Sequence, residues 1–420
     1  MPIASYLAFV AREKRFLAFG FLLAFGSSFG QTYFIGIFGP SIQAEFDLSH
    51  TSWGTIYMTG TICSALLLPW TGRHLDLLDL RIYTVLACGL LIVACLVTAF
   101  TPSALVLVFA IFLLRQSGQG LMSHTAITSM ARYYQRERGR AIAIATIGFA
   151  SGEAVLPVLA VASIALLGWR TSYAGAAVLL GVVLLPAVLW LCKGHSERHQ
   201  AHLELTRKPQ HAAFGLGSWT VGEMLRDVRF YLLLPGVMAP GLILTAMFFH
   251  HLNLADAKGW SHAWITGSYV IYAVTTTVTS LFSGALVDRF GAARVVPIML
   301  VPLTLALLVF WAFDSKWAAW PYLALAGINV GIAFTAVSAM WPEVYGVIHL
   351  GAIKSLTHAL GVFASALGPV TMGALTDLGV PIADVCLIFA GYALFGTLLM
   401  KRALRPRRIF TGGGEQRDSP

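Results

Sequence analysis

The sequence predicts an all-α integral membrane protein with twelve transmembrane helices in two pseudo-symmetric six-helix bundles. Three observations support this fold class: the composition, the number of apolar runs and an internal repeat. Apolar residues make up 57% of the 420-residue chain and charged residues only 11%, whereas soluble domains carry about 25% charge. The mean hydropathy of +0.76 agrees with lipid as the main solvent. The composition therefore excludes a soluble enzyme, a nucleic-acid-binding domain and a disordered chain.

Twelve apolar runs are long enough to cross a bilayer, which takes about 20 residues of helix. In the first half they fall at 16–40, 52–71, 82–101, 103–131, 141–167 and 169–192. In the second half they fall at 230–253, 263–287, 292–313, 317–342, 350–376 and 381–401. We therefore expect four segments, since a polar stretch separates the two sets. They are an N-terminal bundle (1–192), a cytoplasmic linker (193–229), a C-terminal bundle (230–401) and a cytoplasmic tail (402–420).

The distribution of Lys and Arg predicts the orientation, because cytoplasmic connections carry the excess of basic residues. Of the 28 basic residues, 24 fall on the side that holds both termini. Arg170, Lys258 and Lys316 fall on the opposite side, and Arg115 falls inside a helix. We therefore expect both termini in the cytoplasm of a bacterial-type cell with this chain in its inner membrane. The net charge of +9 then reflects topology rather than an anionic partner.

An internal repeat relates the two halves at a constant offset of 212 positions. The matching pairs are Ser49-His50 with Ser261-His262, Gly72 with Gly284, Asp76 with Asp288, and Gly139 with Gly351. They fall in the same topological order in each half, at the start of the second helix, in the loop after it and in a later loop. Six-helix repeats of this kind form transporters in which the substrate site lies between the halves.

The loop after the second repeat's second helix carries a recognisable motif. The run from Gly284 to Arg294, GALVDRFGAAR, resembles the signature loop of the major facilitator superfamily. In the first copy Gly72 and Asp76 keep their spacing, but Leu77 replaces the usual base. The resemblance implies alternating-access transport and a cytoplasmic gate. The gate residues that it implies are Gly72, Asp76, Gly284, Asp288, Arg289 and Arg294.

The residues of this loop also indicate a gating role independently of the resemblance to the superfamily. Glycine permits a tight turn between packed helices, and an acid such as Asp288 can pair with Arg132 or Arg140 at neighbouring helix ends. Such pairs break when the halves rock, so they bias one conformation without touching substrate. The alternative is that the charges merely mark the inner face.

Arg115 and Glu153 are ionisable residues deep inside predicted spans, where charge is costly and usually functional. Arg115 lies about 22 Å and Glu153 about 18 Å from the cytoplasmic helix ends, so both are near the midplane. As a structural ion pair they would lock two helices together. As a working pair, Arg115 would bind an anionic substrate while Glu153 takes up a proton.

Two further resemblances bear on the substrate. The run Arg115 to Gly120 is similar to helix 4 of the superfamily, whereas Glu153 occupies a position where its drug antiporters have proline. The run Trp341 to Gly346 is loosely similar to the monocarboxylate and oxalate–formate porter branch. That likeness implies a small organic anion, with Arg115 and Lys354 as counter-charges.

Other polar residues in the predicted spans either line the substrate path or bond to neighbouring helices. These candidates are Gln31, Tyr33, Gln119, His250, Asn329 and Lys354.

The expected function is secondary active transport, most simply proton-coupled uptake of an organic anion such as a monocarboxylate. The alternatives are uptake of a neutral heteroaromatic or flavin-like vitamin, efflux of a drug or metabolite, and a membrane sensor that transports nothing. The sequence has no phosphate-binding glycine loop, paired cysteines or catalytic triad, so we expect no enzyme, cofactor or metal. The expected partners are a small solute, a proton and the bilayer, without nucleic acid, and the chain is expected to be a monomer.

Overall fold

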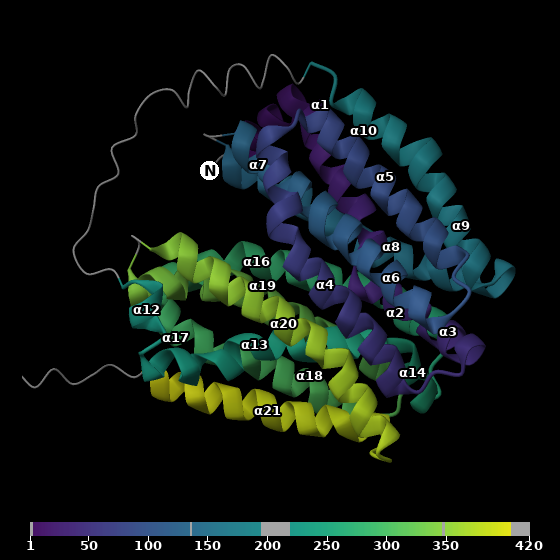
Figure 1. Cartoon of the computed structure of the whole chain (residues 1–420). Helices are drawn as coiled ribbons and strands as arrows, with labels where there is room; N and C mark the ends of the chain where they lie inside the picture. Colours follow the sequence, from purple (N-terminus) through teal and green to yellow (C-terminus); the bar gives the residue numbers. More distant parts are fainter. Residues whose placement is uncertain (1–2, 135–136, 195–218, 347–348, 405–420) are drawn as a thin grey trace, which may run out of the picture.

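The computed structural model describes residues 3–134, 137–194, 219–346 and 349–404. Throughout this part of the chain the regular structure is helical. Figure 1 shows two groups of helices, the purple-to-teal group of the first half above the teal-to-yellow group of the second. The groups approach each other where α2, α3 and α14 lie, which we call the α3–α14 end. The opposite end, where α7 and α17 lie, is the α7–α17 end.

The first group contains α-helices, one 3-10 turn (η1) and two π-helical stretches (η2 and η3). Its elements are α1 (Ile3–Gly26), η1 (Ser27–Gly30), α2 (Thr32–Ile37), α3 (Gly39–Phe46), α4 (His50–Leu77), α5 (Leu80–Ala99), α6 (Ala104–Leu114), η2 (Arg115–Met122), α7 (Ser123–Tyr133), α8 (Arg138–Leu167), α9 (Trp169–Leu179), η3 (Leu180–Leu184) and α10 (Leu185–Leu191).

The second group follows the linker, of which residues 195–218 lie outside the described residues. Its elements are α12 (Val221–Met224), α13 (Val228–Phe249), α14 (His251–Ala257), α15 (His262–Gly267), α16 (Tyr269–Phe290), α17 (Ala292–Val295), η4 (Val296–Ile298), α18 (Leu300–Ala312), η5 (Lys316–Ala318), α19 (Ala319–Tyr345), α20 (Leu350–Asp377) and α21 (Ile382–Ala403). The boundaries that we expect for the four segments stay predictions.

Ten stretches among the described helices are long and apolar enough to cross a membrane, and they coincide with ten of the twelve predicted runs. The other two runs correspond to α1 with α2 and to α4. Helix α4 is rich in threonine and serine. It packs against α6 and η2 in its own group and against α20 in the other. Protein rather than lipid therefore surrounds much of α4, which explains its lower hydropathy.

Two predicted helices are not continuous. The run 16–40 breaks at Gly26, where η1 begins, and resumes as α2 after Gln31, whose backbone is extended. The run 103–131 contains the π-helical η2, so its hydrogen-bond register changes in mid-span. Both interruptions lie at the same place in the fold, because η1 packs directly against η2.

The repeat at 212 positions is visible as the same helix cap in both halves. The Ser49 hydroxyl accepts a hydrogen bond from the Ser52 N–H at the start of α4. The Ser261 hydroxyl accepts one from the Trp264 N–H at the start of α15. A serine cap satisfies one of the free N–H groups of a helix start, so the Ser-His pairs begin corresponding helices.

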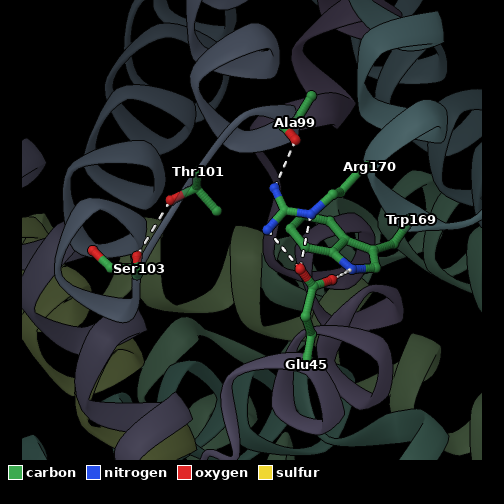
Figure 2. Close-up of polar contacts among 6 residues, drawn as sticks. All are labelled: Glu45, Ala99, Thr101, Ser103, Trp169 and Arg170. Atoms are coloured by element: carbon green, nitrogen blue, oxygen red, sulfur yellow. Dashed lines mark hydrogen bonds and ion pairs between the residues drawn. The ribbon is translucent and has the colours of Figure 1, made fainter.

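A polar clamp holds the first group together at the α3–α14 end (Figure 2). Glu45 in α3 accepts hydrogen bonds from Arg170 Nε at 2.9 Å and Nη2 at 2.6 Å, and from Trp169 Nε1 at 2.6 Å. Arg170 also donates from Nη1 to the Ala99 carbonyl at the end of α5. The hydrogen bond from Arg170 holds the pKa of the Glu45 carboxyl below its usual range. One carboxylate thus connects α3, α9 and α5.

We expect Glu45→Gln to lower the free energy of unfolding by about 1 kcal/mol, because it neutralises one side of a partly exposed charge pair. The measurement is the melting temperature of the detergent-purified protein. Since the folded-state pKa of Glu45 is depressed, its contribution is present at neutral pH and is lost as the pH falls below about 4. The difference between wild type and variant should therefore shrink in acid.

Asp47→Asn is the matched control, because Asp47 lies two residues away and forms no ion pair within the described ranges. Equal melting temperatures of wild type and Glu45→Gln at neutral pH would contradict the stabilising role of the clamp.

Candidate functional site

Arg115 is the first residue of η2 and is almost fully buried, with 2% of its surface exposed. Its Nη1 donates to the Gly30 carbonyl at 3.1 Å and to Thr32 Oγ1 at 3.3 Å. Its guanidinium carbon lies 5.2 Å from the centre of the Tyr57 ring. Its Nε is buried without a hydrogen-bond partner. Over the residues that the structure describes, no carboxylate pairs with this guanidinium.

Two glycines place Arg115 against the broken first helix. A Cβ atom at Gly30 would collide with the Leu114 carbonyl oxygen, and one at Gly118 would collide with the Gly30 backbone. Only glycine allows η1 and η2 to pack this closely, and the approach brings the Gly30 carbonyl to Arg115. A π-helical stretch at such a place is typical of functional sites.

Tyr57 in α4 connects Arg115 with the second group of helices. Its hydroxyl shares a 2.5 Å hydrogen bond with Thr32 Oγ1, so Thr32 and the Tyr57 ring both contact the guanidinium. The centre of the Tyr57 ring lies 4.5 Å from that of Phe249 at the end of α13. Phe249 also stacks on Trp53, at 4.9 Å between ring centres. A single side chain, that of Tyr57, thus connects the positive charge with the second group of helices.

Glu153 lies in the middle of α8 and is partly exposed. Its carboxylate forms no hydrogen bond or ion pair with any described residue. Helix α8 packs against α2, α15 and α16, and Glu153 lies within electrostatic range of Tyr33 in α2 and of Tyr269 and Tyr272 in α16. Arg115 and Glu153 therefore do not form the structural ion pair that their similar depth allowed, at least in this conformation.

The other candidates in the first group differ in their surroundings. Gln31 donates from Nε2 to Ser123 Oγ at 3.3 Å and is partly exposed. Gln119 is also partly exposed, one turn beyond Arg115. The Tyr33 hydroxyl is buried without a hydrogen-bond partner. All three lie on elements that pack around Arg115 or Glu153, so they stay candidates for the substrate path.

The candidates in the second group divide into buried and exposed residues. Asn329 is fully buried and donates to the Met299 carbonyl at 2.7 Å, which ties α19 to the start of α18. His250 is buried and bonds through Nε2 to the Pro369 carbonyl in α20. These contacts hold helices together. Lys354 is exposed near the start of α20.

At the α3–α14 end a carboxylate joins the two groups. Asp377, the last residue of α20, accepts hydrogen bonds from the His50 N–H at 3.2 Å and the Thr51 N–H at 2.8 Å. These are free N–H groups at the start of α4, where a negative charge is stabilised by the helix dipole. Sequence reasoning did not single out Asp377, because a carboxylate at a helix end resembles an ordinary loop charge. We call this contact the Asp377 latch.

The backbones of α4 and α20 touch beside the latch. A Cβ atom at Gly54 would collide with the Val370 backbone, and one at Gly373 would collide with the backbone of His50. Asn253 in α14 adds a hydrogen bond from Nδ2 to Gln43 Oε1 at 3.2 Å. This end of the interface is therefore closed by direct backbone packing.

The predicted gate lies at the α7–α17 end. Gly72 lies inside α4 and Gly284 inside α16, so the expected tight turns at these glycines are wrong. In the second copy the turn is made by Gly291, with a φ of 80°. The side chain of Asp76 lies outside those that the structure describes.

The charged gate residues Asp288, Arg289 and Arg294 are exposed. Asp288 forms no ion pair with Arg132 or Arg140 in this conformation, as judged over the described residues. The carboxylate that holds the loop is instead Glu343 in α19, which accepts from the Ala292 N–H at 2.8 Å.

Comparisons with known proteins agree with this architecture. The sequence model of the Major Facilitator Superfamily matches residues 20–369. The nucleoside transporter NupG has a similar structure, with a TM-score of 0.70 at 16% identity over 93% of this chain and 99% of that one. The inward open conformation of the xylose transporter XylE from E. coli has a TM-score of 0.66 at 14% identity, over 92% and 95%. The chain belongs to the major facilitator superfamily, and it is a membrane-embedded secondary transporter rather than an enzyme.

Proposed function

We propose that this transporter takes up a small organic anion, such as a monocarboxylate, together with a proton. The observation that carries the proposal is a buried guanidinium, on Arg115, without a carboxylate partner among the described residues. An isolated charge inside a membrane span has a high free-energy cost. The hydrogen bonds of Arg115 to a carbonyl and a hydroxyl do not neutralise that charge. An anionic solute would supply the missing charge.

Glu153 provides the second half of the mechanism. It is an unpaired carboxylate on the next long helix, at a similar depth. In the empty transporter the positive Arg115 and the negative Glu153 sum to zero. With an anion on Arg115 and a proton on Glu153 the sum is again zero. Both states therefore carry the same charge through the membrane, whereas an anion without a proton adds one uncompensated charge.

We also propose that both termini lie in the cytoplasm of a cell whose inner membrane holds the chain, and that the chain works as a monomer. The excess of Lys and Arg at the α7–α17 end supports this orientation. The Asp377 latch would then close the outer side in this conformation. The inner gate charges Asp288, Arg289 and Arg294, exposed here, would pair when the inner side closes.

A second candidate is uptake of a neutral heteroaromatic solute. It is favoured by an aromatic cluster next to α8 in which the His251 and Tyr269 rings stack at 5.2 Å. Phe248 contacts Tyr269 and Tyr272 edge-on in the same cluster. Flat aromatic solutes stack on such side chains, and NupG, named as a nucleoside transporter, has a similar fold.

We expect a monocarboxylate to raise the melting temperature of the purified wild type, since a ligand that binds the folded state stabilises it. The rise should be larger at a pH of about 5.5 than at a pH of about 7.5, because the proposed anion-bound state carries a proton on Glu153. The panel consists of formate, lactate, pyruvate, oxalate and the nucleoside uridine. In Glu153→Gln, whose amide imitates the protonated acid, the carboxylate effect should be equal at both pH values. In Arg115→Gln it should be lost.

Uptake into proteoliposomes completes this test. Glu153→Gln should abolish accumulation driven by a pH gradient but spare exchange of labelled for unlabelled anion. Ser163→Ala is the control, because it changes a neutral side chain of α8, ten residues beyond Glu153, that bonds to the Ala160 carbonyl of its own helix. Stabilisation by uridine alone, retained in Arg115→Gln, would contradict the anion proposal and support the second candidate. Binding without flux would support a sensor.

The Asp377 latch generates a separate prediction. We expect Asp377→Ala to widen the distance between spin labels at Ala44 and Ser315, which are exposed at the α3–α14 end of the two groups. Loss of two hydrogen bonds to a charged group, each worth about 1.5–3 kcal/mol, should shift the population by tenfold or more. The measurement is pulsed electron spin resonance in nanodiscs.

Asp384→Ala is the matched control, because Asp384 binds Trp311 within the second group. A distance distribution of Asp377→Ala that equals that of wild type and control would show that the latch does not hold this end closed.

A further inference from the structure

A groove between α5 and α10 lies outside the substrate path. It has a volume of about 530 Å³ and is lined by Asp79, Arg81, Ile82, Val85, Leu86 and Leu189. Its place follows from the two helices that form it. Helix α5 begins its apolar span at Leu80, and the span that contains α10 ends at Leu191. The groove is therefore at the membrane boundary, where lipid headgroups lie.

The apolar part of the groove faces outward. The side chains of Ile82 and Leu86 are 54% and 56% exposed, and Val85 between them is 39% exposed. These residues lie one turn or less apart on α5 and form one apolar strip beside Leu189. In a spanning helix such a strip contacts acyl chains rather than water.

The polar part of the groove carries Asp79 and Arg81, and Lys193 beside it makes the sum of the three charges positive. The Asp79 carboxylate is engaged, because it accepts from the Arg81 N–H at 2.8 Å and caps α5. The Arg81 guanidinium is exposed and forms no ion pair within the described ranges. Lys193, next to the groove residue Gly194, is also exposed and unpaired in the part of the chain that the structure describes.

We propose that this groove binds an anionic phospholipid, with its phosphate between Arg81 and Lys193 and one acyl chain along Ile82, Val85 and Leu86. The groove matches such a lipid in charge and in polarity. Its basic residues lie at the depth of the headgroups, and its apolar strip continues from there into the membrane. Basic pockets between transmembrane helices at this depth recognise anionic lipid headgroups. A free phosphate or a soluble anion would leave the apolar half of the groove unused.

The test uses the full chain in dodecyl maltoside with added phosphatidylglycerol, phosphatidylcholine or inorganic phosphate. Bound lipid is counted by native mass spectrometry, and the melting temperature is measured in parallel. We expect phosphatidylglycerol to be retained and to stabilise the protein, phosphatidylcholine to do so less, and inorganic phosphate not at all. The double variant Arg81→Gln/Lys193→Gln should bind phosphatidylglycerol about fivefold more weakly for each base removed.

Two further variants keep the test decisive. Lys401→Gln/Arg402→Gln removes two exposed bases at the end of α21 and should leave lipid retention unchanged. Val85→Trp fills the groove without changing its charge and should also release the lipid. The proposal is overturned if inorganic phosphate stabilises as well as the lipid does. Equal losses in the groove and control double variants, or full retention in Val85→Trp, would overturn it as well.

Discussion

The contact on which the rest of this structure depends is that of the Tyr57 ring with both the Arg115 guanidinium and the Phe249 ring. Arg115 belongs to the first group of helices and Phe249 to the second. Tyr57 stands in α4, the helix whose first residues form the Asp377 latch. A solute that binds Arg115 as we propose, and draws the guanidinium away from Tyr57, would therefore act on the same helix that closes the α3–α14 end. Coupling between a solute site and a distant contact requires packed side chains with two discrete arrangements. Here the first two turns of α4 would connect Tyr57 with the Asp377 latch.

The second constraint is the cost of charge in a membrane. An alternating-access transporter moves its own charges as well as those of its solute when the two halves rotate. Each uncompensated charge raises the free-energy barrier of that conformational change. In the mechanism that we propose, Arg115 and Glu153 meet this constraint without touching, because their charges balance within the same group of helices. A closed ion pair would balance them too, but it would leave no free charge for a solute. The geometry that keeps them apart comes from the Gly30–Gly118 contact, which turns Arg115 toward η1, α2 and α4. Glu153 lies instead against α2 and α16.

Much of the fold followed from local sequence rules, whereas the site followed from them only in part. Apolar runs and the Ser49 and Ser261 caps act locally, so the spans and the repeat were predictable. Arg115 was predictable as a buried charge, but its partners Thr32 and Tyr57 come from distant segments that only packing brings together. The π-helical register of η2 depends on the same packing. The contact of Glu343 with the backbone of α17 was not predictable, because nothing in the local sequence shows that α19 reaches that helix.

The measurement that tests the central claim most directly is proton movement during anion uptake. Proteoliposomes with a pH-sensitive dye inside receive an inward gradient of the monocarboxylate that stabilises the protein, while the current is recorded on a supported membrane. Charge balance between Arg115 and Glu153 predicts that the lumen acidifies with anion entry, and that a monovalent anion carries no net current. Anion entry that produces a negative inward charge movement, without acidification, would contradict the account.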